Sequence, residues 1–211
     1  MATIADILKF IETVAPTYMK EDWDNVGLNC GHIDRPVTKI LVALDPFTHV
    51  CREAKNIGAD LLVTHHALIW KPGFITDTNT QGRNTLFLIE NGIAHINAHT
   101  NLDQAPGGVN DVLAAKLGLE NIKIINPRDG IGLMRCGDVQ EQPLETFLAT
   151  VKDALCCDGM RYVNSGKSSK KLLWVAEAAP AVCLMRWLLA ATPLSLQISS
   201  TTSSGMPTIW V

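Results

Sequence analysis

Two clusters of metal-ligating side chains follow apolar segments in the first half of the chain. His65 and His66 are adjacent and come directly after the run from Leu61 to Thr64, and His99 and Asp103 follow a second apolar run further along. Adjacent histidines beyond a strand can turn toward two neighbouring cations, and a carboxylate from the next strand end can complete or bridge the pair. The spacing therefore indicates a dinuclear metal site.

These residues also have structural interpretations. A single histidine at a strand end is usually a hydrogen-bonded structural residue. Asp103 could cap the following helix, although Gly108 or Asn110 is the nearer candidate for that role. The combination of two adjacent histidines with a histidine and an aspartate four residues apart favours metal ligation. The remaining histidines, which lack such neighbours and are interpreted as structural, are His32, His49 and His95.

The elements that position these clusters alternate between helical and strand patterns over the first 125 residues. Apolar residues recur at helical or strand spacing, and glycines close several of the segments. The predicted helices are 4–14, 47–57, 83–91 and 108–117, and the predicted strands are 39–44, 60–64 and 93–98. Strands separated by helices require crossover connections. The fold class is therefore α/β, with a mainly parallel sheet flanked by helices.

The two clusters fall at corresponding places in this predicted sheet. In open α/β sheets, ligands bind beyond the carboxyl ends of the strands. His65 and His66 follow one strand, and the segment from His99 to Asp103 follows the next. We therefore expect the clusters to converge at one edge of the sheet.

Composition excludes several classes of protein. The chain has 211 residues, 47% of them hydrophobic, which is sufficient for a buried core, and its formal net charge of −3 is too small to indicate a nucleic-acid partner. Asp6, Lys9 and Glu12 interrupt the first apolar run, so no secretory signal is expected. The six cysteines show no zinc-type or disulfide-framework spacing, which favours reduced thiols and a cytoplasmic location.

Three shorter patterns are weaker candidates for functional sites than the histidine clusters. The vicinal pair Cys156 and Cys157 could be a redox or metal pair, and plain helix residues are the simpler interpretation. Gly107 and Gly108 precede a helix and could approach a phosphate, but a two-glycine loop is a weak signal and we interpret it as a simple turn. The polar stretch 164–169 lacks the full phosphate-loop pattern, so we interpret it as a solvated loop.

Three motifs together resemble one family. They are 21-EDWDNVGL-28, 64-THHALI-69, and 99-HTNLD-103 followed by 107-GGVND-111. Their order and content resemble the type 2 GTP cyclohydrolase I homologues, also called Nif-three-like dinuclear metal centre hexameric proteins. The resemblance spans residues 21 to 119.

The resemblance implies two divalent ions, of zinc, iron or manganese, bound by His65, His66 and Asp103, with His99 as a further ligand or a partner of one. It also implies a metal-dependent hydrolase that opens the purine ring of GTP or acts on a related small molecule, and a homohexamer in intact members. The alternative is a non-catalytic metal-binding or partner-binding scaffold. Two ions sharing a water lower its pKa and supply hydroxide at neutral pH.

Two expected ligands are absent from the chain. Family members contribute a histidine and a glutamate from a C-terminal Gly-His-Tyr-x-x-Glu motif, yet this chain has no histidine after His99. We therefore expect impaired activity and at most one weakly held ion, since affinity depends on the number of ligands.

The composition changes near Lys171. Residues 172–211 contain only two charged side chains, Glu177 and Arg186, whereas the whole chain is 18% charged. Pro180 and Pro193 argue against a membrane anchor in this apolar region. With suitable synonymous codons, the neighbouring reading frame of two tail segments encodes family-like sequence. We therefore predict an out-of-frame, truncated tail, for which a hexamer is not expected.

The predicted domain organisation follows from these observations. Residues 1–125 form a first α/β lobe that carries the metal-ligand motifs. Residues 126–171 begin a second lobe, which stays incomplete, and residues 172–211 form the aberrant tail.

Overall fold

The computed structural model describes residues 1–71, 73–125 and 127–157 in full, and the backbone of four later strands. The chain divides into two compact units, Met1–Ala105 and Pro106–Val211. This division lies before the lobe boundary predicted at residue 125. The helix and the strand that follow residue 105 pack with the sheet of the second unit.

The first unit contains a four-stranded sheet in the order β1-β4-β3-β2. Strands β2, β3 and β4 are mutually parallel, and β1 joins β4 in antiparallel register. The elements are α1 (Ile4–Val14), a 3-10 turn (Thr17–Met19), β1 (Gly27–Cys30), β2 (Ile40–Ala43), α2 (Thr48–Asn56), β3 (Leu61–Thr64), α3 (Thr80–Glu90), β4 (Ala94–Asn97) and α4 (Thr100–Gln104). The predicted α/β class with a mainly parallel sheet is confirmed. Strand β1 and helix α4 were not predicted.

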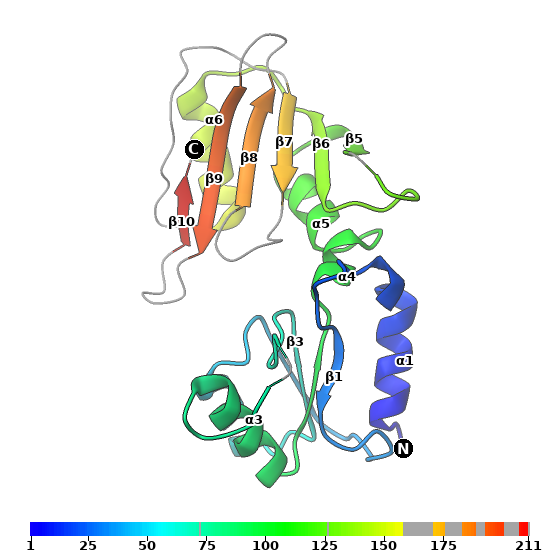
Figure 1. Cartoon of the computed structure of the whole chain (residues 1–211). Helices are drawn as coiled ribbons and strands as arrows, with labels where there is room; N and C mark the ends of the chain where they lie inside the picture. Colours follow the sequence, from blue (N-terminus) through cyan, green and yellow to red (C-terminus); the bar gives the residue numbers. More distant parts are fainter. Residues whose placement is uncertain are drawn as a thin grey trace. The chain divides into compact units, whose positions relative to one another are not determined.

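Helices cover both faces of this sheet, and Figure 1 shows α1 and α3 on opposite sides of it. On one face, Ile4 of α1 packs with Leu61 and Ile96 of the central strands. On the other face, Leu88 of α3 packs with Leu62. The alternation of Leu61 and Leu62 between the two faces follows from the two-residue period of a strand. A strand buried on both faces therefore supports the site that follows it.

Helix α1 begins at a capping box. The Thr3 side chain accepts a hydrogen bond from the Asp6 amide at 3.3 Å, and the Asp6 carboxylate accepts one from the Thr3 amide at 2.8 Å. This reciprocal pair satisfies amide groups that have no partner within the helix. The start of α1 is therefore encoded locally, close to its predicted position.

The second unit is built around an antiparallel sheet in the order β10-β9-β8-β7-β6-β5. Its elements are α5 (Val109–Lys116), β5 (Glu120–Ile124), β6 (Met134–Asp138), α6 (Leu144–Leu155), β7 (Lys171–Val175), β8 (Cys183–Leu188), β9 (Pro193–Ser200) and β10 (Pro207–Trp210). The buried Arg135 of β6 donates to Asp111 of α5 at 2.5 Å, which ties that helix to the sheet.

The structure explains those of the three short sequence patterns that fall within its described residues. Gly108 is the N-cap of α5, and the Gly107 amide donates to the Asp111 carboxylate at 2.7 Å, as in a turn. Cys156 is the left-handed C-cap of α6, so the interpretation of the cysteine pair as helix residues was wrong: the helix ends before both. Residues 164–169 lie outside the described residues.

The cysteines and the helices were also compared with the expectations drawn from composition. The cysteines of the described part of the chain, Cys30, Cys51, Cys136, Cys156 and Cys157, are free thiols. Among the described residues, no helix combines the length and the apolar content that a membrane crossing requires.

Candidate metal centre

The two histidine clusters lie at the carboxyl ends of neighbouring parallel strands. Thr64 at the end of β3 is paired with Asn97 at the end of β4. Beyond β3, the amides of His65 and His66 donate to the carbonyls of Ala43 and Leu44, at 3.3 and 3.0 Å. Hydrogen bonding to the β2 side thus continues past the strand and fixes the backbone that carries both imidazoles.

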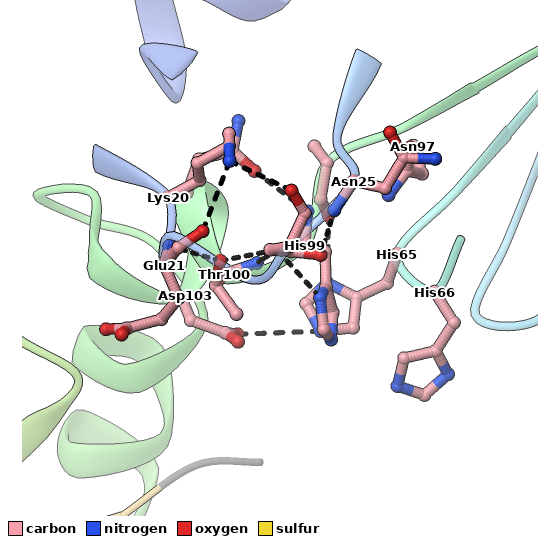
Figure 2. Close-up of polar contacts among 12 residues, drawn as sticks. Lys20, Glu21, Asn25, His65, His66, Asn97, His99, Thr100 and Asp103 are labelled. Atoms are coloured by element: carbon pink, nitrogen blue, oxygen red, sulfur yellow. Dashed lines mark hydrogen bonds and ion pairs between the residues drawn. The ribbon is translucent and has the colours of Figure 1, made fainter. Parts of the chain in front are cut away.

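The side chains of His65, His66 and His99 converge at this edge (Figure 2). Each offers a ligand atom, and these atoms all lie within 4.8 Å of one another. The ring centroids are 5.0 Å apart for His65–His66, 5.0 Å for His65–His99 and 5.6 Å for His66–His99. Three imidazoles from two strand ends therefore meet around one small volume.

Asp103 reaches the same place from helix α4. His99 is the N-cap of this helix, and the Asp103 amide donates to the His99 carbonyl at 2.9 Å. One helical turn therefore places both side chains on the same face. Oδ1 of the buried Asp103 lies 3.5 Å from Nε2 of His65, an approach marked by a dashed line in Figure 2.

The protein holds two of the imidazoles through their Nδ1 atoms. Nδ1 of His65 donates to the Ala98 carbonyl at 3.0 Å, and Nδ1 of His66 donates to Oδ1 of Asp45 at 2.6 Å. A proton on Nδ1 leaves the lone pair on Nε2, which is the atom that a cation needs. Both rings are thus fixed in the tautomer that ligates through Nε2.

His99 is held in the same way by a buried carboxylate. Its Nδ1 donates to Oδ2 of Asp24 at 2.9 Å, and the amide and hydroxyl of Thr100 donate to the same oxygen. Burial alone would raise the pKa of Asp24, but the hydrogen bonds from His99 and Thr100 outweigh it and lower the pKa to about 2. Asp24 is therefore a carboxylate near neutral pH and orients His99.

Two residues important for this geometry were missed as candidates in the sequence. Asp24 lies within the first family-like motif, but its type alone gave no reason to pair it with His99. Asp45 follows β2, at the same edge of the sheet as the histidines. The position of an acidic residue directly beyond a parallel strand was the available signal.

The histidines interpreted as structural lie outside the cluster. His95 is fully buried in β4, and its Nε2 lies 2.8 Å from Oγ1 of Thr64. Because the Thr64 hydroxyl donates to the His66 carbonyl, Nε2 of His95 is the donor in this contact. Burial lowers the pKa of His95 to about 3. His32 and His49 are exposed.

Two tryptophans stand beside the imidazole cluster. The Trp70 ring lies 5.0 Å from the His99 ring at 87° and 6.3 Å from the His66 ring. The Trp23 ring lies 6.0 Å from the His99 ring at 73°. Trp23 is 51% exposed and Trp70 is 44% exposed, whereas His99 is 2% exposed. The two tryptophan side chains thus reach from the buried His99 ring to the solvent-exposed surface.

The donor set fits a divalent transition-metal ion. Ligand atoms on one such ion lie about 2.0–2.2 Å from it, and so roughly 3 to 4 Å apart. The separations of up to 4.8 Å therefore need only small side-chain movements to close on an ion. Mixed imidazole and carboxylate ligands suit zinc, iron(II) or manganese.

Comparison with known proteins agrees with this geometry. The model of the Duf34/NIF3 (NGG1p interacting factor 3) family matches residues 2–180. The chain belongs to this family. The resemblance drawn from the three sequence motifs is confirmed.

Curated relatives share a descriptive name. A Clostridium perfringens protein called GTP cyclohydrolase 1 type 2 homolog is 40% identical over 164 residues, which cover 75% of this chain and 63% of the relative. A Lactococcus lactis protein of the same name is 32% identical over 162 residues, covering 76% and 62%. The chain thus spans less than two thirds of the length of these relatives.

Solved structures show the same fold. Staphylococcus aureus hypothetical protein SA1388 is 30% identical with a TM-score of 0.76, and the match covers 84% of this chain and 72% of that protein. Reduced HcgD from Methanocaldococcus jannaschii is 37% identical with a TM-score of 0.64, covering 72% and 60%. These solved proteins therefore share both sequence similarity and the fold with this chain.

Proposed function

We propose that the protein is a metal-dependent hydrolase of a nucleotide or a related small molecule. In this proposal His65, His66 and Asp103 are metal ligands, and His99 is a further ligand or supports one. The observation that carries it is the convergence of three imidazoles within 4.8 Å, with the Asp103 carboxylate 3.5 Å from His65. The shared name of the curated relatives supports the substrate class.

The chain's own residues have defined tasks in such a reaction. His65, His66 and Asp103 would hold the divalent ions, whose Lewis acidity would activate water for attack and stabilise developing negative charge. Asp45 and Asp24 hold the His66 and His99 rings in the ligating tautomer, and the Ala98 carbonyl does the same for His65. These fixed orientations reduce the reorganisation needed when an ion binds.

Two ions are expected of the family, and this chain is expected to hold fewer. Residues 100–211 contain no histidine, so the given residues do not supply the further histidine ligand that the resemblance implies. Fewer ligands give weaker binding. We therefore expect one weakly bound ion for this chain and two for a version with the complete ligand set.

Metal analysis tests the proposal directly. The purified chain is equilibrated with zinc, iron(II) or manganese, and bound metal is quantified after gel filtration. His65→Ala should reduce the bound metal several-fold, while His49→Ala, which changes an exposed histidine outside the cluster, should not. Metal content that is low and unchanged in His65→Ala would contradict the metal centre.

Activity measurements separate the hydrolase from the alternative of a non-catalytic scaffold. Formate release from GTP that disappears on chelation would support hydrolysis. Stable capture of a protein partner, with no chelator-sensitive turnover of GTP or other nucleotides, would support the scaffold. Light scattering on the same samples tests whether this chain forms the hexamer that the resemblance implies for intact members.

A further inference from the structure

We propose that Trp23 and Trp70 form a subsite that stacks a planar heteroaromatic ring, such as a purine base, beside the imidazole cluster. This inference rests on the proposed function and assigns residues to substrate recognition. Each indole lies within 6.0 Å of the His99 ring, and each keeps about half of its surface exposed.

The orientation of the rings suits stacking. Both indoles stand steeply to the His99 ring, at 73° for Trp23 and 87° for Trp70. Neither indole is therefore stacked face to face on the buried imidazole, and both pack in the edge-to-face manner that aromatic quadrupoles favour. About half of each indole side chain stays accessible to solvent. An exposed indole face stacks on nucleobases of any sequence, because every base has a π face.

Hydrogen bonds hold the backbone under both indoles. The Asn25 side chain donates to the Ile69 carbonyl at 2.6 Å, so the segment after Trp23 is tied to the residue before Trp70. The Ile69 amide donates to Asn29, and the Trp70 amide donates to Gln81, at 3.1 and 3.2 Å. The two indole positions are thus set in advance, which lowers the entropic cost of binding a ring.

The subsite would place a ring close to the reacting centre. The Trp70 ring lies beside the rings of both His66 and His99, so a base stacked on it would lie next to the imidazole cluster. Hydrolysis requires the attacked atom within about 3.5 Å of the activated water. Stacking supplies this positioning without any charged contact to the base.

Binding of guanosine to the whole chain tests the proposal. Guanosine lacks phosphate, so coordination of a phosphate by an ion cannot carry its affinity. We expect Trp70→Ala and Trp23→Ala each to weaken guanosine binding about ten-fold in equilibrium dialysis. Trp70→Phe keeps an aromatic face and should lose less guanosine affinity than Trp70→Leu, which keeps an apolar side chain without a π face. Phe10→Ala changes an exposed aromatic side chain on α1 and should have no effect.

The outcomes separate this proposal from the metal centre. Bound metal is measured on each variant, and circular dichroism confirms that it is folded. Guanosine affinity that is absent in the parent chain, or equal in Trp70→Phe, Trp70→Leu and the parent, overturns the stacking subsite even when metal binding persists. A change in oligomeric state of the tryptophan variants with unchanged guanosine binding also overturns it, because the indoles then serve an interface between copies. Loss of metal in His65→Ala with guanosine binding retained supports the subsite.

Discussion

The Asp45 carboxylate accepts a hydrogen bond from Nδ1 of His66 at 2.6 Å, and the two residues follow neighbouring parallel strands. The Asp45 side chain is 19% exposed and that of His66 is 13% exposed, so solvent only partly screens the pair. A carboxylate in this position fixes the ring and increases the basicity of its other nitrogen. Asp45 is therefore a positioning residue for the candidate metal ligand His66.

Asp45→Asn should weaken metal binding. The amide has nearly the same shape but no charge, so it supports the His66 tautomer less well and adds no basicity to Nε2. We expect a loss of about 10- to 100-fold in zinc affinity, measured by competition with a chromophoric chelator. Asp77→Asn, at an exposed aspartate, is the matched control. Equal zinc affinity in both variants would show that Asp45 has no such role.

His95 should make the free energy of unfolding depend on pH. Burial lowers its folded pKa to about 3, whereas the unfolded chain has the ordinary value near 6.5. Between these values the unfolded state binds more protons than the folded state, so stability falls as pH falls from about 6.5 toward 3. His95→Gln can keep a donor near Thr64 and does not titrate.

The check is a series of urea titrations from pH 7 to pH 4. The free energy of unfolding of His95→Gln should decline less steeply than that of the parent chain, whatever its value at pH 7. Parallel pH profiles for the two proteins would be evidence against the buried, neutral state of His95.

Gly31 should tolerate no larger residue. Its φ is +112°, and an added Cβ would lie 2.8 Å from the Cα of Ala94 in β4. Gly31→Ala therefore combines backbone strain with a clash against backbone, and we expect a loss of at least about 2 kcal/mol. Gly58 has a φ of +67° with open space around it, so Gly58→Ala should cost only about 1 kcal/mol. Thermal or urea unfolding of both variants measures the difference, and equal losses would contradict the clash.

The low charge of residues 172–211 leads to a prediction about the gene. We expect an inserted or missing base near the codons for Lys170 to Leu173. Restoring the frame should encode family-like sequence in place of residues 172–211. DNA sequencing across these codons decides the matter, since an intact frame there rules the prediction out.

Individual elements show which parts of the fold can be predicted from local sequence patterns. The run Leu61–Thr64 and the glycines after the helices were sufficient to place β3 and to end α2 and α3 within a few residues. Helix α4 was missed because it has only five residues and no apolar period to detect. Strand β1 was missed for a related reason: it has four residues and pairs with β4, which is far away in sequence. Short elements depend on partners that a local window does not contain.

The sequence by itself determined the residue types at each strand end and the alternation of helices and strands. It thereby also determined the expectation that His65, His66, His99 and Asp103 share one edge, because parallel strands align their carboxyl ends. Tertiary structure alone decided which nitrogen of each imidazole faces the others. It did so through partners distant in the chain, such as Asp24, which lies 75 residues from His99. Strand periodicity is a property of neighbouring residues, whereas the orientation of a buried ring depends on the groups that packing brings to its other nitrogen.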